Sequence, residues 1–245
     1  MKKYIVSVML LIFLLNINNA VIRADNNDNS NFTICIDPGH QKKGDSKSEP
    51  VAPNSSNKKA RVSQGTEGIG SKKAEYVVNL EASLLLKDIL IEKGYNVIMT
   101  RENHEVNISN AERAEVANKA KANMTIRIHC DSLKDTSKTG ASILIPSKNS
   151  KNTKSIYEES NKFANILKEK LKNQGIKVNG IFERDDITGF NWSTVPVVIL
   201  EMGFMSNYSE DKMLCDPCYQ KKLMNIVAES IDKYKCCAQL IEKNE

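Results

Sequence analysis

Phe32-Thr33-Ile34-Cys35-Ile36-Asp37-Pro38-Gly39-His40 joins a short apolar run to a polar turn. Residues 32–37 predict a buried strand, because a short apolar run bounded by Pro and Gly is typical of one. In an open parallel sheet, ligands collect just beyond the carboxyl ends of the strands. The segment therefore predicts a first strand that delivers His40 to the functional edge of a sheet.

Downstream of this strand, apolar runs alternate with amphipathic ones. Ser109 and Glu112 have the spacing of a capping box, which predicts the start of one of the helices. Strands that alternate with helices of this length indicate an α/β fold with an open, twisted, mostly parallel sheet and helices on both faces. We expect strands at 95–100, 124–128, 141–145 and 195–200, and helices at 74–93, 109–120, 155–173 and 218–235.

The chain has the size and composition of a single globular domain. It has 245 residues, of which 40% are hydrophobic and 27% charged, enough for a sizeable core. Lys2 and Lys3, the apolar run that follows them, and Ala20 and Ala24 are typical of a secretory signal. We expect a signal peptide at 1–24, or alternatively an uncleaved N-terminal anchor, a linker at 25–31, a catalytic domain at 32–236 and a polar tail at 237–245.

The signal-like start predicts a secreted protein, and the net charge and the cysteines restrict its partners and its fold. The formal net charge of +5 favours adsorption to an anionic polymer and is too diffuse to indicate nucleic acid binding. The six cysteines do not form the pattern of a disulfide scaffold. Cys35 is expected in the core, and a zinc knuckle at Cys215 and Cys218 would lack two ligands. We therefore expect these two cysteines to form a local disulfide or to be free thiols.

Residues 41–71 form a long polar segment rich in Gly, Ser, Pro and Lys. The segment shows no apolar periodicity, which predicts a loop. Loops of this length inside a domain are usually functional or mobile.

Three titratable residues stand at the ends of predicted strands. His40 and His129 follow two of them, and Glu201 directly follows the apolar run 197–200. The chain has only three histidines, so two at one edge are informative. Catalytic zinc takes three protein ligands from His and carboxylates and leaves a position for water. His40 and His129 are therefore candidate ligands.

Four residues are candidates for the third ligand: Glu75, Glu201, Glu67 and His104. His104 lies in a polar stretch and fits an exposed loop residue. Glu201 would be costly to bury unless it met a metal or transferred protons. Glu75 fits an ordinary first-turn acid that complements the helix dipole. The residues alone leave the choice open.

Two other hydrolase classes conflict with the sequence. A serine hydrolase would need a G-x-S-x-G turn after a strand, and none follows any predicted strand. A cysteine peptidase would have to use Cys130, whose neighbouring histidine is the adjacent residue, His129. Side chains at adjacent strand positions point to opposite faces, which excludes that pair.

The order of several motifs resembles the zinc N-acetylmuramoyl-L-alanine amidases of the Amidase_3 type, including clostridial-type catalytic domains. The resemblance runs from about residue 32 to residue 234. Its motifs are Ile36-Asp37-Pro38-Gly39-His40, Glu75 with Asn79-Leu80, Val97-Ile98-Met99-Thr100-Arg101, Asn110-Ala111-Glu112-Arg113 with Ala117-Asn118, Ile126-Arg127-Ile128-His129, and Val198-Ile199-Leu200-Glu201-Met202-Gly203-Phe204-Met205-Ser206-Asn207.

This resemblance implies an open, six-stranded α/β fold and a zinc-dependent cell wall hydrolase. It implies His40, Glu75 and His129 as ligands of one catalytic Zn²⁺ and Glu201 as the catalytic carboxylate. The implied substrate is peptidoglycan, cut between N-acetylmuramic acid and the L-alanine of the stem peptide. Asn191, in a stretch that looks like the family's substrate-side loop, is the implied substrate contact.

The chain departs from the family pattern at four positions near the site. Gln41 stands where Gly is common, Tyr76 where Lys is common, Arg127 where a small residue is common, and Cys130 where Ala is usual. None of these changes removes a ligand. The alternative function is a catalytically silent peptidoglycan-binding or partner-regulating protein of the same fold. The sequence shows no wall-binding module, which favours an activating protein partner.

Overall fold

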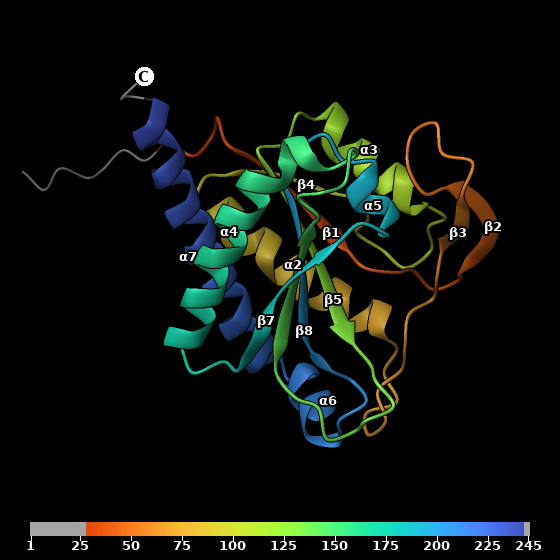
Figure 1. Ribbon diagram of the computed structural model, residues 1–245. Helices are drawn as coiled ribbons and strands as arrows, with labels where there is room; N and C mark the ends of the chain where they lie inside the picture. The colour runs from red at the N-terminus through yellow and green to blue at the C-terminus, as the bar shows by residue number, and fades with distance from the viewer. Residues whose placement is uncertain (1–27, 243–245) are drawn as a thin grey trace, which may run out of the picture.

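A six-stranded sheet crosses the centre of the molecule, a computed structural model in which residues 28–242 are described (Figure 1). The predicted signal peptide or anchor at 1–24, the start of the linker and the last three residues lie outside the described part. None of the helices within residues 28–242 has the length and apolar character needed to span a bilayer.

The central sheet has the strand order β4-β1-β5-β8-β6-β7. All neighbouring strands are parallel except β6 and β8, which are antiparallel. The predicted open, mostly parallel, six-stranded α/β sheet is therefore confirmed. The strands are β1 (Thr33–Pro38), β4 (Asn96–Met99), β5 (Met124–Asp131), β6 (Ala141–Pro146), β7 (Val178–Arg184) and β8 (Val197–Phe204).

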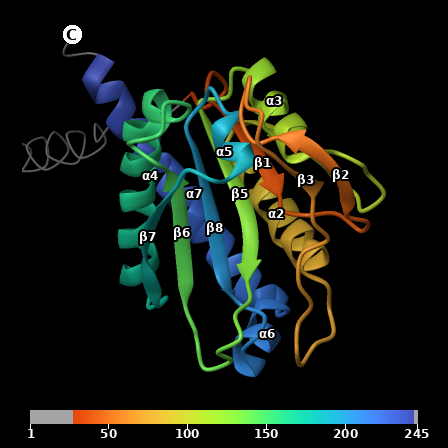
Figure 2. The same cartoon turned by 45° about the vertical axis from the view of Figure 1, so that its right-hand side comes forward.

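Helices cover both faces of this sheet, as predicted (Figures 1 and 2). One face packs against α2 (Glu75–Glu92), α4 (Lys154–Asn173) and α7 (Pro217–Glu242). On the other lie α3 (Asn110–Lys119) and the short α5 (Thr188–Asn191), while α6 (Tyr208–Leu214) packs at the end of β8. The predicted capping box at Ser109 and Glu112 is present. Helix α7 runs past residue 235, where the sequence predicted its end.

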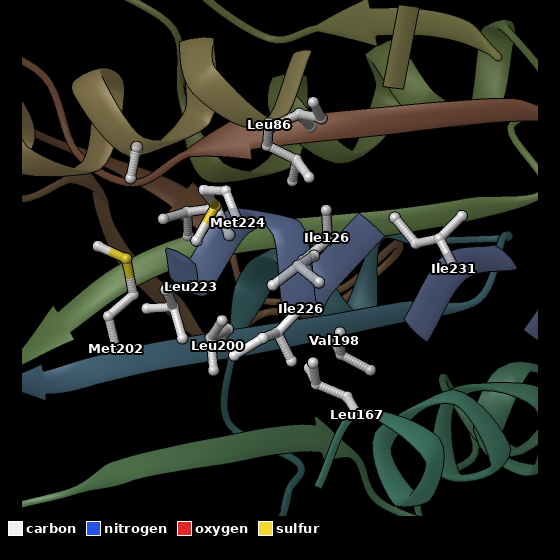
Figure 3. Close-up of a cluster of buried hydrophobic side chains, with 14 of the residues drawn as sticks. Leu86, Ile126, Leu167, Val198, Leu200, Met202, Leu223, Met224, Ile226 and Ile231 are labelled. Carbon is white, nitrogen blue, oxygen red and sulfur yellow. The ribbon is translucent and has the colours of Figure 1, made fainter. Parts of the chain in front are cut away.

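The main core lies between the sheet and α2, α4 and α7 (Figure 3). Val78, Ala82, Leu86 and Leu90 recur every four residues along α2 and are fully buried. This recurrence explains the helix, because residues four apart share one face. Complete burial of one such large aliphatic side chain contributes about 1.5–3 kcal/mol. The core therefore makes a rigid base for the residues at the sheet's edge.

On the opposite face, the described part of the chain forms two small apolar clusters, beneath α3 and α5. Cys35 belongs to the first of them and is fully buried. Burial raises the pKa of the Cys35 thiol to about 12, so it behaves as the small core residue that the sequence predicted. All six cysteines, which lie within the described residues, are free thiols.

The prediction of a loop at 41–71 is wrong in part. The segment contains an antiparallel hairpin of β2 (Asp45–Pro50) and β3 (Lys58–Val62). Polar contacts fix this hairpin: the Trp192 indole donates to the carbonyl oxygen of Pro50 at 2.9 Å, and Glu49 accepts from the backbone N–H of Ala111 at 3.3 Å. Neither strand has a fully apolar face, so the sequence lacks the alternation of apolar and polar residues that predicts a strand.

Strand β7 was not predicted from the sequence, and β5 and β8 end later than predicted. Strand β7 is an edge strand whose side chains are mostly exposed, so it lacks the apolar run of a central strand. Strands β5 and β8 continue past the predicted ends, which places His129 and Glu201 inside them. Backbone pairing continues there although the side chains turn polar, up to an irregularity between His129 and Asp131.

Candidate metal centre

Three side chains from separate elements converge at one edge of the sheet, near the carboxyl ends of β1 and β5. His40 follows β1, Glu75 is the first residue of α2, and His129 lies in β5. One ligand atom from each lies within 4.8 Å of the others. The Oε1 atom of Glu75 is 3.2 Å from Nε2 of His40 and 3.4 Å from Nδ1 of His129. The fold therefore gathers the two predicted histidines around one carboxylate.

A tight backbone turn holds His40 in place. His40 has φ of 60°, in the left-handed region that costs a non-glycine residue about 1–2 kcal/mol. A Cβ on the preceding Gly39 would lie 2.3 Å from the His129 ring, so only glycine fits between the two histidines. The Nδ1 atom of His40 lies 3.0 Å from the carbonyl oxygen of Ser63. This contact orients the ring so that Nε2 faces Glu75.

Glu75 is buried and fully engaged in hydrogen bonds. Its Oε1 accepts from the Asn79 amide and from the backbone N–H of Cys130, both at 3.1 Å, and its Oε2 accepts from the backbone N–H of Thr66 at 3.0 Å. Burial alone would raise the pKa of this carboxyl, but hydrogen bonds with His129 and His40 outweigh it and hold the pKa well below its usual range. Glu75 is therefore a fixed anion, which an ordinary helix-start acid is not.

His129 is held in the neutral form. Burial lowers the pKa of its imidazole to about 4, so it carries no charge at neutral pH. Its Nε2 atom is buried and has no hydrogen-bond partner among the described residues. Neutral imidazole is the form that binds metals.

The donor set fits a divalent metal. Two imidazoles and one carboxylate are the ligands of one common class of catalytic zinc site. The donor atoms lie close enough together for one ion to contact all three groups. Outer hydrogen bonds from Asn79 and Ser63 to two of the three groups supply the support that metal ligands usually have.

Glu201 lies directly beside His129 on the neighbouring strand. The two residues are register partners in the parallel pair of β5 and β8, so their side chains share one face of the sheet, and the strands lie about 4.8 Å apart. The Oε2 atom of Glu201 is buried without a partner among the described residues. Burial and then the charges of Glu75 and Asp131 raise the pKa of Glu201 well above its usual value. This environment suits a group that takes up and returns a proton.

The other predicted candidates lie outside the cluster. Asn191 is buried in α5, and its amide donates to the carbonyl oxygen of Asp185 at 2.9 Å. A substrate contact by Asn191 stays a prediction. His104 packs against Tyr76, with ring centroids 5.2 Å apart, and Glu67 is exposed.

Sequence reasoning missed a buried charge network beneath the site. Asp37 accepts hydrogen bonds from Arg113 and Arg127, each at 2.7 Å. Arg113 also donates to the carbonyl oxygen of His40 at 2.8 Å, and Arg101 to that of Gly39 at 2.9 Å. The arginines therefore fix the turn that carries the first histidine. The sequence contains one indication of this network. Arg127 precedes His129 by two positions on one strand, so both side chains lie on the same face of the sheet.

Replacing Asp37 with Asn should destabilise the protein by about 3–5 kcal/mol, because removing one partner of a buried ion pair leaves the other charge uncompensated. Burial raises the pKa of Asp37, but Arg113 and Arg127 outweigh this and hold it far below its usual range. This stabilisation is present above the unfolded pKa of about 3.9 and is lost only as the pH falls through the lower folded value. Urea unfolding at pH 7 measures the loss. The exposed Asp135→Asn variant is the control, and an equal midpoint for both variants would contradict the role of Asp37.

Comparison with known proteins identifies the family of the chain. A family model described as N-acetylmuramoyl-L-alanine amidase matches residues 34–233. The chain belongs to this Amidase_3 family. The amidase is 27% identical over 186 residues to the germination-specific N-acetylmuramoyl-L-alanine amidase of Bacillus subtilis, covering 68% of this chain and 73% of that one. It is 25% identical to the probable cell wall amidase LytH of Staphylococcus saprophyticus, covering 88% of this chain and 64% of LytH.

Solved structures share the fold of the amidase. The apo form of Ami1 from Mycobacterium abscessus matches with a TM-score of 0.76 at 22% identity, over 84% of this chain and 99% of that one. The CwlD amidase of Clostridioides difficile, solved in complex with the GerS lipoprotein, matches with a TM-score of 0.67 at 24% identity, over 84% of this chain and all of that one. The protein is therefore a peptidoglycan amidase by family, and it shares the fold of these solved structures.

Proposed function

We propose that the amidase hydrolyses the bond between the lactyl carbonyl of N-acetylmuramic acid and the nitrogen of L-alanine, with one Zn²⁺ held by His40, Glu75 and His129. The observation that carries this proposal is the convergence of these three donors beside the unpartnered carboxylate of Glu201. The family supports the substrate class.

Each protein group has a defined part in the proposed reaction. Zinc in such a site polarises a carbonyl oxygen and lowers the pKa of a water molecule towards neutrality. Glu201 takes the proton of the attacking water and returns it to the departing alanine nitrogen. Its raised pKa helps both steps, because the group must hold the proton between them. Glu75 and His129 keep their positions through the hydrogen bonds and burial described above.

We also propose that the amidase acts outside the membrane, at the cell wall. The signal-like residues 1–24 and the cell wall amidases among its relatives support this location. A protein partner is part of the proposal, because CwlD of C. difficile was solved in complex with the GerS lipoprotein. Contact with the membrane would then come from an uncleaved N-terminus.

Digestion of purified peptidoglycan tests the proposed bond. With zinc present, mass spectrometry should find free stem peptides that begin with an L-alanine amino group, together with intact glycan strands. A chelator should stop their release. Cleaved glycan strands or cleaved peptide cross-links would contradict the proposed bond. If zinc binds but no product forms, with or without a partner, the chain would instead be the silent wall-binding protein.

A further inference from the structure

A surface pocket of about 330 Å³ lies next to Glu201, on the side away from the three metal-binding residues. It lies over β6 and β7 and under the connection between β5 and β6, and we call it the β6–β7 pocket. Figure 2 shows this connection at the same end of the sheet as α6. The pocket is lined by Asp131, Leu133, Lys138, Ser142, Asn179 and Phe182, together with two deeper apolar residues.

The pocket continues a row of side chains that begins at the metal centre. Glu201 pairs with His129 on one side and with Ser142 of β6 on the other. The amide of Asn179, on β7, donates to Oγ of Ser142 at 3.3 Å. Neighbouring strands lie about 4.8 Å apart, so the row reaches about 10 Å beyond Glu201. An extended peptide covers that distance in three residues at about 3.3–3.6 Å each.

We propose that the β6–β7 pocket binds the second and third residues of the departing peptide. This inference rests on the proposed function, in which Glu201 protonates the leaving nitrogen. The leaving nitrogen must then lie at Glu201, and the peptide attached to it extends away from the metal, across Ser142 towards Asn179. The glycan side of the substrate lies in the other direction, towards His40.

The lining of the pocket specifies the chemistry of this peptide. Leu133 and Phe182 are 46% and 45% exposed, which offers apolar contact to the aliphatic parts of a peptide. Among residues 28–242, Lys138 forms an ion pair only with the exposed Asp135, at 3.7 Å, and this contact is too weak to compete strongly with a ligand. Lys138 therefore binds a peptide carboxylate, and Asp131 binds an ammonium group. The ligand is a peptide that carries both charges within its first three residues.

Two synthetic substrates separate the pocket from the catalytic centre. The short one is N-acetylmuramoyl-L-alanine, and the long one is N-acetylmuramoyl-L-alanyl-γ-D-glutamyl-L-lysine. For Phe182→Ala, we expect the ratio of kcat/KM on the long substrate to kcat/KM on the short one to fall about tenfold, because an apolar wall is lost. Lys138→Ala should lower the ratio about twofold to fivefold, since an exposed ion pair contributes less.

Matched surface variants control for general effects. Lys134→Ala removes a lysine from the same connection but not from the pocket, and Ile91→Ala removes an apolar side chain that is 50% exposed on α2. Both should keep the wild-type ratio. If the wild type cuts only the long substrate, inhibition by free L-alanyl-γ-D-glutamyl-L-lysine replaces the ratio: it should weaken in Phe182→Ala, and equal inhibition of Phe182→Ala and the wild type would overturn the assignment.

The outcomes distinguish the inference from the function on which it rests. If the wild type releases alanine or peptide from neither substrate, the proposed function fails. If the wild type cuts both and the pocket variants change both rates equally, or neither, the pocket does not bind the peptide. A fall on the long substrate with Lys134→Ala as large as with Lys138→Ala would also overturn the assignment.

Discussion

Glu201→Gln should lower kcat/KM about a thousandfold while zinc stays bound at one ion per chain. The substitution keeps the size of the side chain and removes the basic oxygen that accepts the proton of water. General acid–base catalysis contributes about 10²- to 10⁴-fold, and Glu201 performs both proton transfers in the proposed reaction. Release of stem peptide measures the rate, and metal analysis of the same sample measures the zinc.

The contrast between rate and metal content identifies the role of Glu201. A fourth ligand would lose zinc on substitution, whereas a proton carrier would lose only rate. Glu169→Gln is the matched control, because Glu169 lies on the exposed face of α4 far along the chain from the site. A Glu201→Gln enzyme with turnover close to that of the control would exclude a proton-transfer role. Burial of Glu201 without a partner would then need another explanation.

The sequence was most informative where chemistry and strand pattern coincide. His40 and His129 could be placed at one edge because both follow apolar runs that had to be parallel strands. Glu201 was recognisable because a carboxylate beside four buried residues is costly. Glu75 could not be assigned from its own pattern, since the first turn of any helix favours an acid. Groups from distant parts of the chain, such as the loop at Thr66 and both histidines, give Glu75 its surroundings.

Other parts of the molecule left no local signal. The hairpin of β2 and β3 is fixed by single polar contacts to distant residues, such as that of Trp192 with Pro50. Such contacts do not recur at regular intervals in the sequence, so no periodic pattern predicts them. Strand β7 lies at an edge, where neither face needs to be apolar throughout. The β6–β7 pocket combines residues from four strands and a connection. Its composition follows from register, in particular the antiparallel pairing of Ser142 with Glu201.

Loss of the metal is the second large effect, and we expect it from His129→Ala and Glu75→Ala. Each substitution removes one of three donors, which leaves too few protein ligands for a stable zinc site. Changes to residues that hydrogen-bond the ligands commonly weaken metal binding by about 10- to 100-fold, so removing a ligand itself should weaken binding more than about 100-fold. Isothermal titration of the metal-free protein with zinc measures the affinity, and hydrolysis should fall with occupancy.

The chain supplies a matched control for each of these variants. His104 is the third of only three histidines and packs against Tyr76 outside the cluster, so His104→Ala should bind zinc as the wild type does. Glu67 lies in the loop before α2 and is exposed, so Glu67→Gln should also keep the metal. If His104→Ala loses zinc and His129→Ala retains it, the ligand set is wrong. Because Glu75 accepts a hydrogen bond from the backbone of Cys130, circular dichroism of Glu75→Ala must show an intact fold for its zinc loss to count.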